Sequence, residues 1–365
     1  ETRLFGRAMW LLARSASPEE LISTVTSAAL RLTSAMRAVD EALETGADAT
    51  AAQANAQMAS ATVDKQLQEL KLILIGDAEK DHDEGRGARV AAAAIVQPEF
   101  AVMLVSCLHL LPLETRKNAA HVFTNLARRS DGAAFAANVA NNTIILSSLI
   151  DAYKDDKADL ALICGMMLRE TARHEIVAKS LLEAPYFWRF FTDFVRLKSF
   201  EVASDAFELL KALLVGHCSL AAAFIEANYE TFVLHYNQLL QSENYVTCRE
   251  SLRLLGELLL ERANFSTMMK YISDPENLKV LMSLLRSKKA RIQIEAFHVF
   301  KVFVANPRKP DAINSILFKN KDKLVAYLRN FHNDRDDDQF AEEKALVIDT
   351  LVGLAKPETQ YSCLH

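Results

Sequence analysis

Two short segments begin like known metal-binding motifs, and both fail at a residue that the metal requires. Residues 174–178 (His-Glu-Ile-Val-Ala) start like the HExxH helix of zinc proteases, but Ala178 stands where the second histidine ligand is needed. Residues 334–339 (Asp-Arg-Asp-Asp-Asp-Gln) start like a calcium loop. Gln339 replaces the glycine of its sharp turn, however, and Ala345 replaces its bidentate glutamate. We therefore expect no metal site at either segment.

Other catalytic signatures are equally incomplete. Residues 85–87 (Gly-Arg-Gly) could begin a phosphate-binding loop, but no third glycine and no Lys-Ser or Lys-Thr pair follows. The chain contains no G-x-S-x-G motif, and its nine histidines are dispersed without a clear nucleophile partner. His298 lies between Phe297 and Val299 on an apolar helix and is expected to be structural. We expect no catalytic residue, no cofactor and no enzyme activity.

Composition limits the class of protein further. The chain has 365 residues, a formal net charge of −5 and 50% hydrophobic residues, so a basic nucleic-acid-binding protein is disfavoured. No apolar run approaches the ~20 residues of a membrane-spanning helix. The five cysteines are odd in number and never form a C-x-x-C pair, which is typical of a reducing compartment; they are Cys107, Cys164, Cys218, Cys248 and Cys363. These features predict a soluble, cytoplasmic protein.

The elements that position any functional residue are expected to be helices. Ten glycines and eight prolines leave few turns for β-hairpins, and apolar residues recur at spacings of three and four. Four segments that begin at Ala161, Ala206, Ser251 and Ala296 align without gaps at intervals of 45 residues, and a weaker copy begins at Ala119, 42 residues before Ala161. A helical period of 40–47 residues is that of HEAT and armadillo arrays. The sequence therefore predicts an all-α, armadillo/HEAT-like, right-handed helical-repeat solenoid.

We expect one elongated domain with three regions. Residues 1–94 form N-terminal capping helices, with an Ala-rich insertion over 46–62 and a charged loop over 77–89. The two segments are either local insertions or a plain Ala-rich helix followed by a flexible connection. Repeats follow over 95–355, and a polar tail over 356–365. A basic stretch lies in the last repeats, because residues 280–325 contain ten Lys and Arg against three Asp and Glu.

Several side chains in the repeats are candidates for binding a partner protein. Phe200 and Tyr245 occupy equivalent positions of neighbouring repeats and could face a concave surface, although Phe200 also extends an apolar stripe and could belong to the core. Arg249 lies off the matching stripe and is expected to be exposed. Met282 lies on the stripe of its helix, which favours the core.

Lys319 and Lys323 share one helix face within the basic stretch. Such a face is ordinarily solvated. The sharper interpretation is a surface that binds an acidic ligand.

Long stretches from Cys164 onward closely resemble the calcium-binding protein 39 family, the mouse-protein-25 scaffolds. The matching stretches are residues 164–170 (Cys-Gly-Met-Met-Leu-Arg-Glu), 173–175, 203–207, 242–247, 254–260, 270–273 and 295–307. The resemblance covers about 200 residues strongly. It is weaker over 95–160, where Arg128 and Arg129 still fit, and poor over the first 90 residues.

The resemblance implies a non-catalytic armadillo-like scaffold. Family members bind a pseudokinase or a germinal-centre-type (sterile-twenty) kinase, hold it in an active-like conformation, and can complete a complex with an upstream Ser/Thr kinase. The positions that match the family's concave contact surface are Phe200, Tyr245, Arg249, Arg262 and Phe265. Those that match a pocket for a Trp-Glu-Phe-like tail of the partner are Lys279, Met282, Lys319 and Lys323.

Three residues depart from the family pattern beside that surface. Cys248 replaces a basic residue, Glu250 a neutral polar residue and Ala263 a histidine. The choice of kinase could differ because of them. The alternative to a kinase scaffold is an armadillo-type transport or general interaction adaptor. A nuclear-import adaptor would line its groove with repeated Trp and Asn, and this chain has only Trp10 and Trp188, which do not follow the repeat spacing.

Overall fold

The computed structural model describes residues 17–76, 84–154 and 158–355. Over these residues the chain forms 19 α-helices and five short 3-10 helices, with no β-strand. This confirms the expected all-α helical-repeat fold. Contacts within the chain define two compact units, Glu1–Gly216 and His217–His365, called unit 1 and unit 2 below.

The helices follow one another with short connections. Unit 1 contains α2 (Pro18–Thr45), α3 (Thr50–Ile75), α4 (Glu84–Val96), α5 (Pro98–Ser106), η1 (Leu108–Leu110), α6 (Leu113–Arg128), α7 (Gly132–Asn141), α8 (Thr143–Asp151), η2 (Ala152–Lys154), α9 (Ala158–Thr171), α10 (Glu175–Glu183), η3 (Pro185–Trp188), α11 (Arg189–Thr192), η4 (Phe194–Arg196) and α12 (Phe200–Val215). Unit 2 contains α13 (Cys218–Ala227), α14 (Tyr229–Leu240), α15 (Tyr245–Leu260), η5 (Arg262–Asn264), α16 (Phe265–Tyr271), α17 (Pro275–Leu285), α18 (Ala290–Ala305), α19 (Asp311–Arg329) and α20 (Asp338–Val352).

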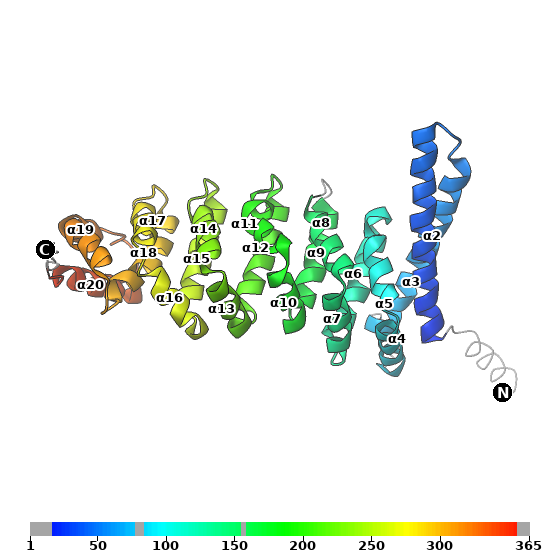
Figure 1. Cartoon of the computed structure of the whole chain (residues 1–365), viewed down its shortest axis with the longest axis horizontal. Helices are drawn as coiled ribbons and strands as arrows, with labels where there is room; N and C mark the ends of the chain where they lie inside the picture. Colours follow the sequence, from blue (N-terminus) through cyan, green and yellow to red (C-terminus); the bar gives the residue numbers. More distant parts are fainter. Residues whose placement is uncertain (1–16, 77–83, 155–157, 356–365) are drawn as a thin grey trace, which may run out of the picture. The chain divides into compact units, whose positions relative to one another are not determined.

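Each unit is built from stacked layers of helices (Figure 1). In unit 1 the long helices α3, α6, α9 and α12 pack side by side in that order, while α5 packs on α8, and α7 packs on α4 and α10. In unit 2 the long helices α15, α18 and α20 pack side by side, with α17 against α14 and α19. A helix in such a stack buries its apolar stripe against its neighbours rather than within its own repeat, which is the energetic basis of repeat proteins.

The predicted 45-residue period is confirmed for the long helices α12, α15 and α18. Ala206 on α12, Ser251 on α15 and Ala296 on α18 are each fully buried, and the other buried positions of these helices recur at the same spacing. A small side chain at this position lets neighbouring helices approach closely.

The predicted position in α9 is wrong by three residues. Cys164, rather than Ala161, is equivalent to Ala206, because the buried residues of α9 coincide best with those of α12 after a shift of 42. Ala119 then lies 45 residues before Cys164. The interval from α6 to α9 is therefore 45 residues and the interval from α9 to α12 is 42 residues, which is the reverse of the predicted order. An apolar stripe with repeats of three and four still matches after a shift of three, so the sequence alone favoured the wrong register.

Gly165 makes room for a polar cluster that joins α9 to α12. Tyr153 donates a 2.6 Å hydrogen bond to Asp205, and Arg169 pairs with the same carboxylate. A Cβ on Gly165 would lie 1.9 Å from the Asp205 Oδ2 atom and 2.5 Å from the Tyr153 hydroxyl. Burial and the nearby Asp205 raise the pKa of Tyr153, so its hydroxyl stays protonated. Only glycine fits beside this cluster.

We expect Gly165→Ala to lower the free energy of unfolding by about 2–4 kcal/mol, because the new methyl group must displace a buried, hydrogen-bonded carboxylate. Gly256→Ala on α15 is the matched control, since its Cβ would meet nothing closer than 3.9 Å. That change should be neutral or stabilising by about 0.5–1 kcal/mol, because alanine favours helix. Urea unfolding of both variants measures the difference, and equal stabilities would contradict the packing described.

Proline and capping residues mark the starts of two helices. Ser17 caps α2 in a capping box with Glu20, and Asp274 caps α17, whose first residue is Pro275. The expected charged loop over 77–89 is wrong in part. Residues 77–83 lie outside the described chain, but α4 already begins at Glu84, so the Gly-Arg-Gly segment is helical.

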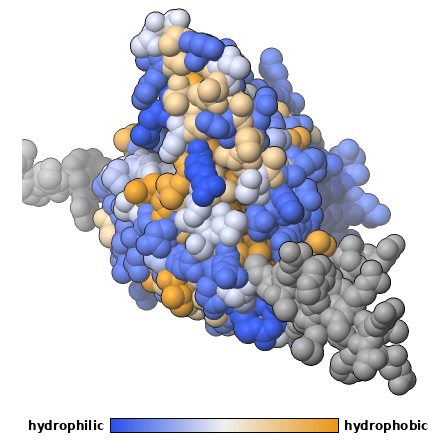
Figure 2. All heavy atoms as spheres, turned by 90° about the vertical axis from the view of Figure 1, so that its right-hand side faces the viewer, coloured by the Kyte–Doolittle hydropathy of each residue, from blue (hydrophilic) through white to orange (hydrophobic). Residues whose placement is uncertain are grey.

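The Ala-rich segment over 46–62 belongs to a helical hairpin, since all but its first residues lie in α3, which packs along α2. The tip of this hairpin extends beyond the other helices of unit 1 (Figure 1). Weakly hydrophobic and polar surfaces are mixed along the hairpin in Figure 2. Large apolar side chains are exposed on it, including Leu30, Leu43 and Met58.

No single helix in the described part of the chain is long and apolar enough to cross a membrane. Three pairs of consecutive helices reach that length and composition only together, and each pair bends by 81° to 96° at its break.

Candidate functional site

A pocket of about 1150 Å³ opens between α17, α18 and α19 of unit 2. It is lined by Lys279, Met282, Ser283, Leu285, Arg286, Gln293, Ile316, Asn320, Lys323, Leu324 and Tyr327. The structure thus brings together Lys279, Met282 and Lys323, three of the four pocket residues named from the sequence. Lys319 lies one turn before Lys323 on α19 and is exposed, but it does not line the pocket.

The floor of this pocket is apolar because the edge of a core stripe reaches the surface there. Leu278, Leu281 and Leu285 of α17 are buried, whereas Met282 is only half-buried and faces the pocket. The core position expected for Met282 is therefore wrong. The periodicity of apolar residues does not distinguish the edge of an apolar stripe from its centre. In α17 the edge of the stripe is exposed to the pocket.

The walls of the pocket are held in place by hydrogen bonds that connect its helices and the turns beside them. The Tyr327 hydroxyl donates to the Leu285 carbonyl, and the Gln293 side-chain amide donates to the Ser287 carbonyl over 2.7 Å. His332 Nε2 lies 2.8 Å from Gln293 Oε1, which ties the turn after α19 to α18. The pocket is thus shaped before any ligand arrives, and such preorganisation reduces the entropy lost on binding.

The rim of the pocket is positively charged. Its lining contains Lys279, Arg286 and Lys323 and no carboxylate. Lys279 pairs with Glu276 on its own helix, while Lys323 makes no ion pair with any described residue. An apolar floor under a cationic rim suits a short peptide with aromatic side chains and an acidic group.

A second candidate surface lies at the start of α15. Tyr245, the first residue of the helix, is half-buried, and the Lys289 ammonium lies 4.8 Å from its ring centre. Arg249 follows one turn later and is also half-buried, rather than freely exposed as expected. It pairs with Glu250 over 3.0 Å and with Glu295 of α18 over 3.8 Å.

Charges around Arg249 are nearly balanced. Glu250 also pairs with Arg253 over 3.1 Å, and Arg253 reaches Glu257 over 3.7 Å. Burial raises the pKa of Glu295, while Arg249 and Arg253 oppose that rise. Arg249 therefore presents a cation whose charge is already shared by two carboxylates of its own chain.

Three further residues are named for the concave surface, one in unit 1 and two in unit 2. Phe200 begins α12 in unit 1 and is 60% exposed, so it is a surface residue and not part of the core. Arg262 and Phe265 are exposed just beyond the opposite end of α15, about 25 Å along the helix from Tyr245. The structure thus brings Tyr245 and Arg249 together, and it does not bring Arg262 and Phe265 to the same end.

The three departures from the family pattern have different surroundings. Cys248 is buried and its thiol donates to the Leu240 carbonyl, so it faces the core. Ala263 is exposed in η5. Glu250 alone of the three contacts a residue named for the site, namely Arg249.

A shallow groove of about 210 Å³ lies between α15 and α18 and was not anticipated. Its lining is Leu252, Arg253, Gly256, Leu260, Glu295, His298 and Lys301. His298 is partly exposed in this groove, 3.7 Å from Glu343 of α20, and its ring also contacts Phe340. Burial lowers the pKa of His298, and the neighbouring Lys301 adds to that effect. The 45-residue period could have located the groove, since His298 is equivalent to Arg253.

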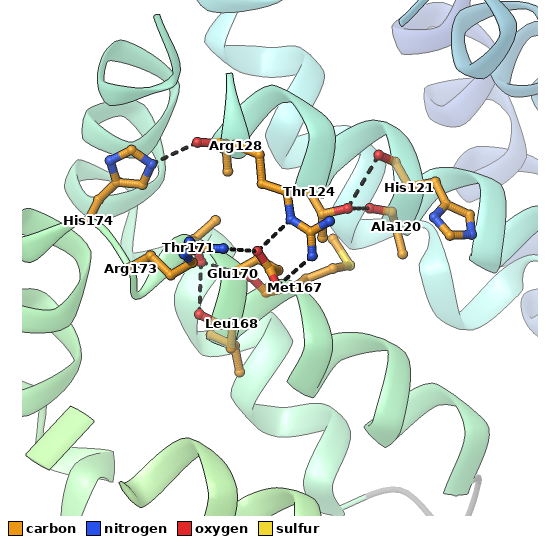
Figure 3. A network of polar contacts seen from close by, with 11 residues as sticks. Ala120, His121, Thr124, Arg128, Met167, Leu168, Glu170, Thr171, Arg173 and His174 are labelled. Atoms are coloured by element: carbon orange, nitrogen blue, oxygen red, sulfur yellow. Dashed lines mark hydrogen bonds and ion pairs between the residues drawn. The ribbon is translucent and has the colours of Figure 1, made fainter. Parts of the chain in front are cut away.

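The motif fragments have structural roles. His174 Nε2 lies 2.7 Å from the Ala127 carbonyl and ties α10 to α6 (Figure 3). Asp337 caps α20 by accepting from Phe340 N and pairs with Arg335. Within the described ranges, no group of three or more His, Cys, Asp or Glu side chains is arranged to hold a metal ion.

Comparison with known proteins gives close relatives over most of the chain. A family model described as Mo25-like matches residues 10–355. The chain is 46% identical over 301 residues to a human protein named calcium-binding protein 39-like, covering 82% of this chain and 88% of the relative. It is 45% identical to the mouse protein of that name over the same length and coverage. It is also 44% identical over 293 residues to the degreening-related gene dee76 protein of Auxenochlorella protothecoides, covering 78% of this chain and 89% of that protein.

Proposed function

This chain belongs to the Mo25-like family, a family of scaffold proteins, and on that premise we propose that it is a non-catalytic scaffold for a protein kinase. It binds a pseudokinase or a Ser/Thr kinase of the sterile-twenty, germinal-centre class. It stabilises the active-like state of that kinase, and the pair can recruit a third, upstream Ser/Thr kinase. The proposed setting is the cytoplasm.

The observation that carries this proposal is the pocket between α17, α18 and α19. Met282 on its floor and the cations on its rim match a tail that carries two aromatic side chains, one acidic residue and a terminal carboxylate. Such a tail is the Trp-Glu-Phe-like partner segment implied by the family. Lys319, exposed one turn from Lys323, adds positive charge beside the entrance.

A second contact would act on the folded kinase itself. Phe200, Tyr245, Arg249, Arg262 and Phe265 are the proposed concave contact residues, and two of them, Phe200 and Phe265, are more than half exposed. A scaffold that binds only the closed state of a kinase shifts the population toward that state, by no more than its difference in affinity for the two states. Two weak contacts on one chain reinforce each other through effective concentration.

The test is an activity assay with a purified sterile-twenty kinase. Adding the wild-type chain should raise phosphorylation of a generic substrate, and the chain alone should transfer no phosphate. A kinase that neither binds nor responds would leave the general interaction adaptor as the alternative.

Glu250→Gln should strengthen kinase binding by about two- to tenfold. Removing this carboxylate leaves Arg249 and Arg253 less neutralised, so both become better donors for an acidic group of the partner. Glu257→Gln is the matched control, because Glu257 also pairs with Arg253 but does not pair with Arg249. Surface plasmon resonance at two salt concentrations measures both variants. Weaker binding of Glu250→Gln would mean that the carboxylate holds Arg249 in its binding position instead.

A further inference from the structure

An ion-pair cluster joins the carboxyl ends of α6 and α9 in unit 1 (Figure 3). Arg128 donates a hydrogen bond from Nε to the Glu170 carboxylate over 2.6 Å, and its Nη2 forms an ion pair with the other carboxylate oxygen, also over 2.6 Å. Arg173 lies 3.5 Å from the same carboxylate on its other side. One glutamate is therefore held between two guanidinium groups.

The two arginines occupy equivalent positions of neighbouring repeats. Arg173 follows Arg128 by 45 residues, the same spacing that relates Ala119 on α6 to Cys164 on α9. Their side chains therefore start from the same side of adjacent repeats. Such repetition of one residue type on adjacent repeats is how a solenoid builds a binding surface.

The backbone under Arg128 is fixed. The Ala127 carbonyl is bonded to the His174 ring, and Gly132 packs so closely that a Cβ would lie 2.3 Å from that carbonyl oxygen. Next to it, Arg129 pairs with Asp131. Arg128 is thus positioned at both its backbone and its guanidinium group, which reduces the entropy it would lose on binding a ligand.

The cluster is too exposed to contribute much to folding. Arg128 and Arg173 side chains are 55% and 71% exposed, and Glu170 is 18% exposed. Exposed ion pairs contribute about 0–1 kcal/mol. Each guanidinium has five N–H donors, and Glu170 occupies only some of them. The remaining donors are available to a second anion from solvent.

The surroundings of the cluster are positive. Two guanidinium groups and one carboxylate give a net charge of +1. His121, about two helical turns before Arg128 on α6, has a lowered pKa because it is partly buried and because Lys71 and Arg128 repel its proton. Lys71 of α3 is held over α6 by Asn118. The positive charge thus extends from α9 across α6 to α3.

We propose that Arg128 and Arg173 bind a phosphorylated threonine or serine on the activation loop of the bound kinase. This rests on the proposed function. A phosphate monoester carries about −1.5 to −2 charges and three acceptor oxygens, so it can compete with Glu170 for both arginines. A carboxylate of the partner carries no more charge than Glu170, so it would gain little binding free energy by competing with Glu170 for the arginines. Kinase activation loops are ordered through arginine–phosphate pairs, and here the scaffold supplies the arginines.

Glu170 acts in this proposal as an internal substitute for the phosphate. It keeps the two guanidinium groups extended and close together while the site is empty. Its pKa is lowered, chiefly by the hydrogen bond from Arg128, so it stays ionised in the neutral range. When the phosphate binds, Glu170 gives up part of its contact with the arginines.

The test compares a sterile-twenty kinase domain, phosphorylated on its activation loop, with the same domain after phosphatase treatment. Biolayer interferometry against the full chain should show tighter binding of the phosphorylated form by about tenfold. Arg128→Gln and Arg173→Gln should each remove most of that difference without weakening the dephosphorylated form. Lys117→Gln is the control, because Lys117 is an exposed cation on α6 that is paired with a glutamate of the same helix.

Glu170→Gln separates a binding role from a structural one. It should tighten binding of the phosphorylated kinase by about two- to fivefold, because it removes the competing charge. A purely structural cluster would make Glu170→Gln act in the same direction as Arg128→Gln. Equal binding of the two kinase forms to the wild-type chain, or weaker binding after Glu170→Gln, overturns the proposal while leaving the proposed function intact. Binding of neither form overturns both.

Discussion

Replacing Met282 with alanine should weaken binding of a peptide that ends in Trp-Glu-Phe by about 5- to 150-fold, which corresponds to about 1–3 kcal/mol. Met282 is half-buried on the pocket floor, between the buried stripe of α17 and the lining residues of α19. Truncating it removes the apolar surface on which an aromatic side chain would pack. The flexible thioether also adapts to an aromatic ring in a way that alanine cannot.

The stability of the chain should change much less than the affinity. A half-exposed methionine loses less packing on truncation than a core residue, for which about 2–5 kcal/mol is typical. Met58→Ala, an equally truncating change at a methionine that is 71% exposed on α3 of unit 1, is the matched control. Fluorescence polarisation with a labelled peptide measures the affinities. Unchanged affinity of Met282→Ala would show that the tail binds elsewhere.

The charged rim can be tested on the same peptide. Lys323→Glu should lower the affinity further at low salt than at high salt, because Lys323 has no ion-pair partner among the described residues and its charge is available to the peptide. Lys279→Glu should have a smaller effect, since Glu276 already shares the charge of Lys279. A larger effect of Lys279→Glu than of Lys323→Glu would place the acidic residue of the peptide next to α17.

The helical repeat could be predicted because it depends on one-dimensional regularity. The 45-residue period located the small buried residues of α12, α15 and α18, since each repeat packs mainly on its neighbours and the same side chains recur at each interface. It failed at Ala161, because one interval is three residues shorter and a helical stripe tolerates that shift. A gapless comparison has no means of detecting such a deletion.

The candidate site was less predictable, because its chemistry depends on where a stripe reaches the surface. Met282 and Leu281 are adjacent in sequence and both apolar, yet one faces the pocket and the other the core. The remaining lining of α19 could have been extended from Lys323 by steps of three and four, to Asn320, Leu324 and Tyr327. The partners of Arg249 depend on side-chain conformations, and only the structure shows that Glu250 and Glu295 reach it.

Replacing Arg249 with alanine should abolish most kinase activation while leaving the tail pocket functional. Arg249 is on α15, outside the lining of the pocket, so the Trp-Glu-Phe peptide should bind the variant with unchanged affinity. Loss of the guanidinium removes a charge-assisted contact to the kinase and leaves Glu250 and Glu295 to repel acidic groups of the partner. We expect kinase affinity to fall by about 1–3 kcal/mol, with activation falling in parallel.

The same variant should keep its thermal stability, and this separates a binding role from a structural one. Arg249 is partly exposed, and its two ion pairs are of the kind that contribute about 0–1 kcal/mol, so the melting temperature should fall by no more than about 2–4 °C. Without Arg249, the pKa of the half-buried Glu295 should rise further, because a cation that opposes the rise is lost. A group whose pKa is raised on folding lowers the stability of the protein at neutral pH, and that loss disappears as the pH falls. The variant should therefore lose less stability near pH 5 than at pH 7.

Arg329→Ala, at an exposed arginine of α19, is the matched control and should change neither activation nor melting. Full activation by Arg249→Ala would show that the kinase does not contact the start of α15, and the proposed surface would have to be sought around Arg262 and Phe265 instead.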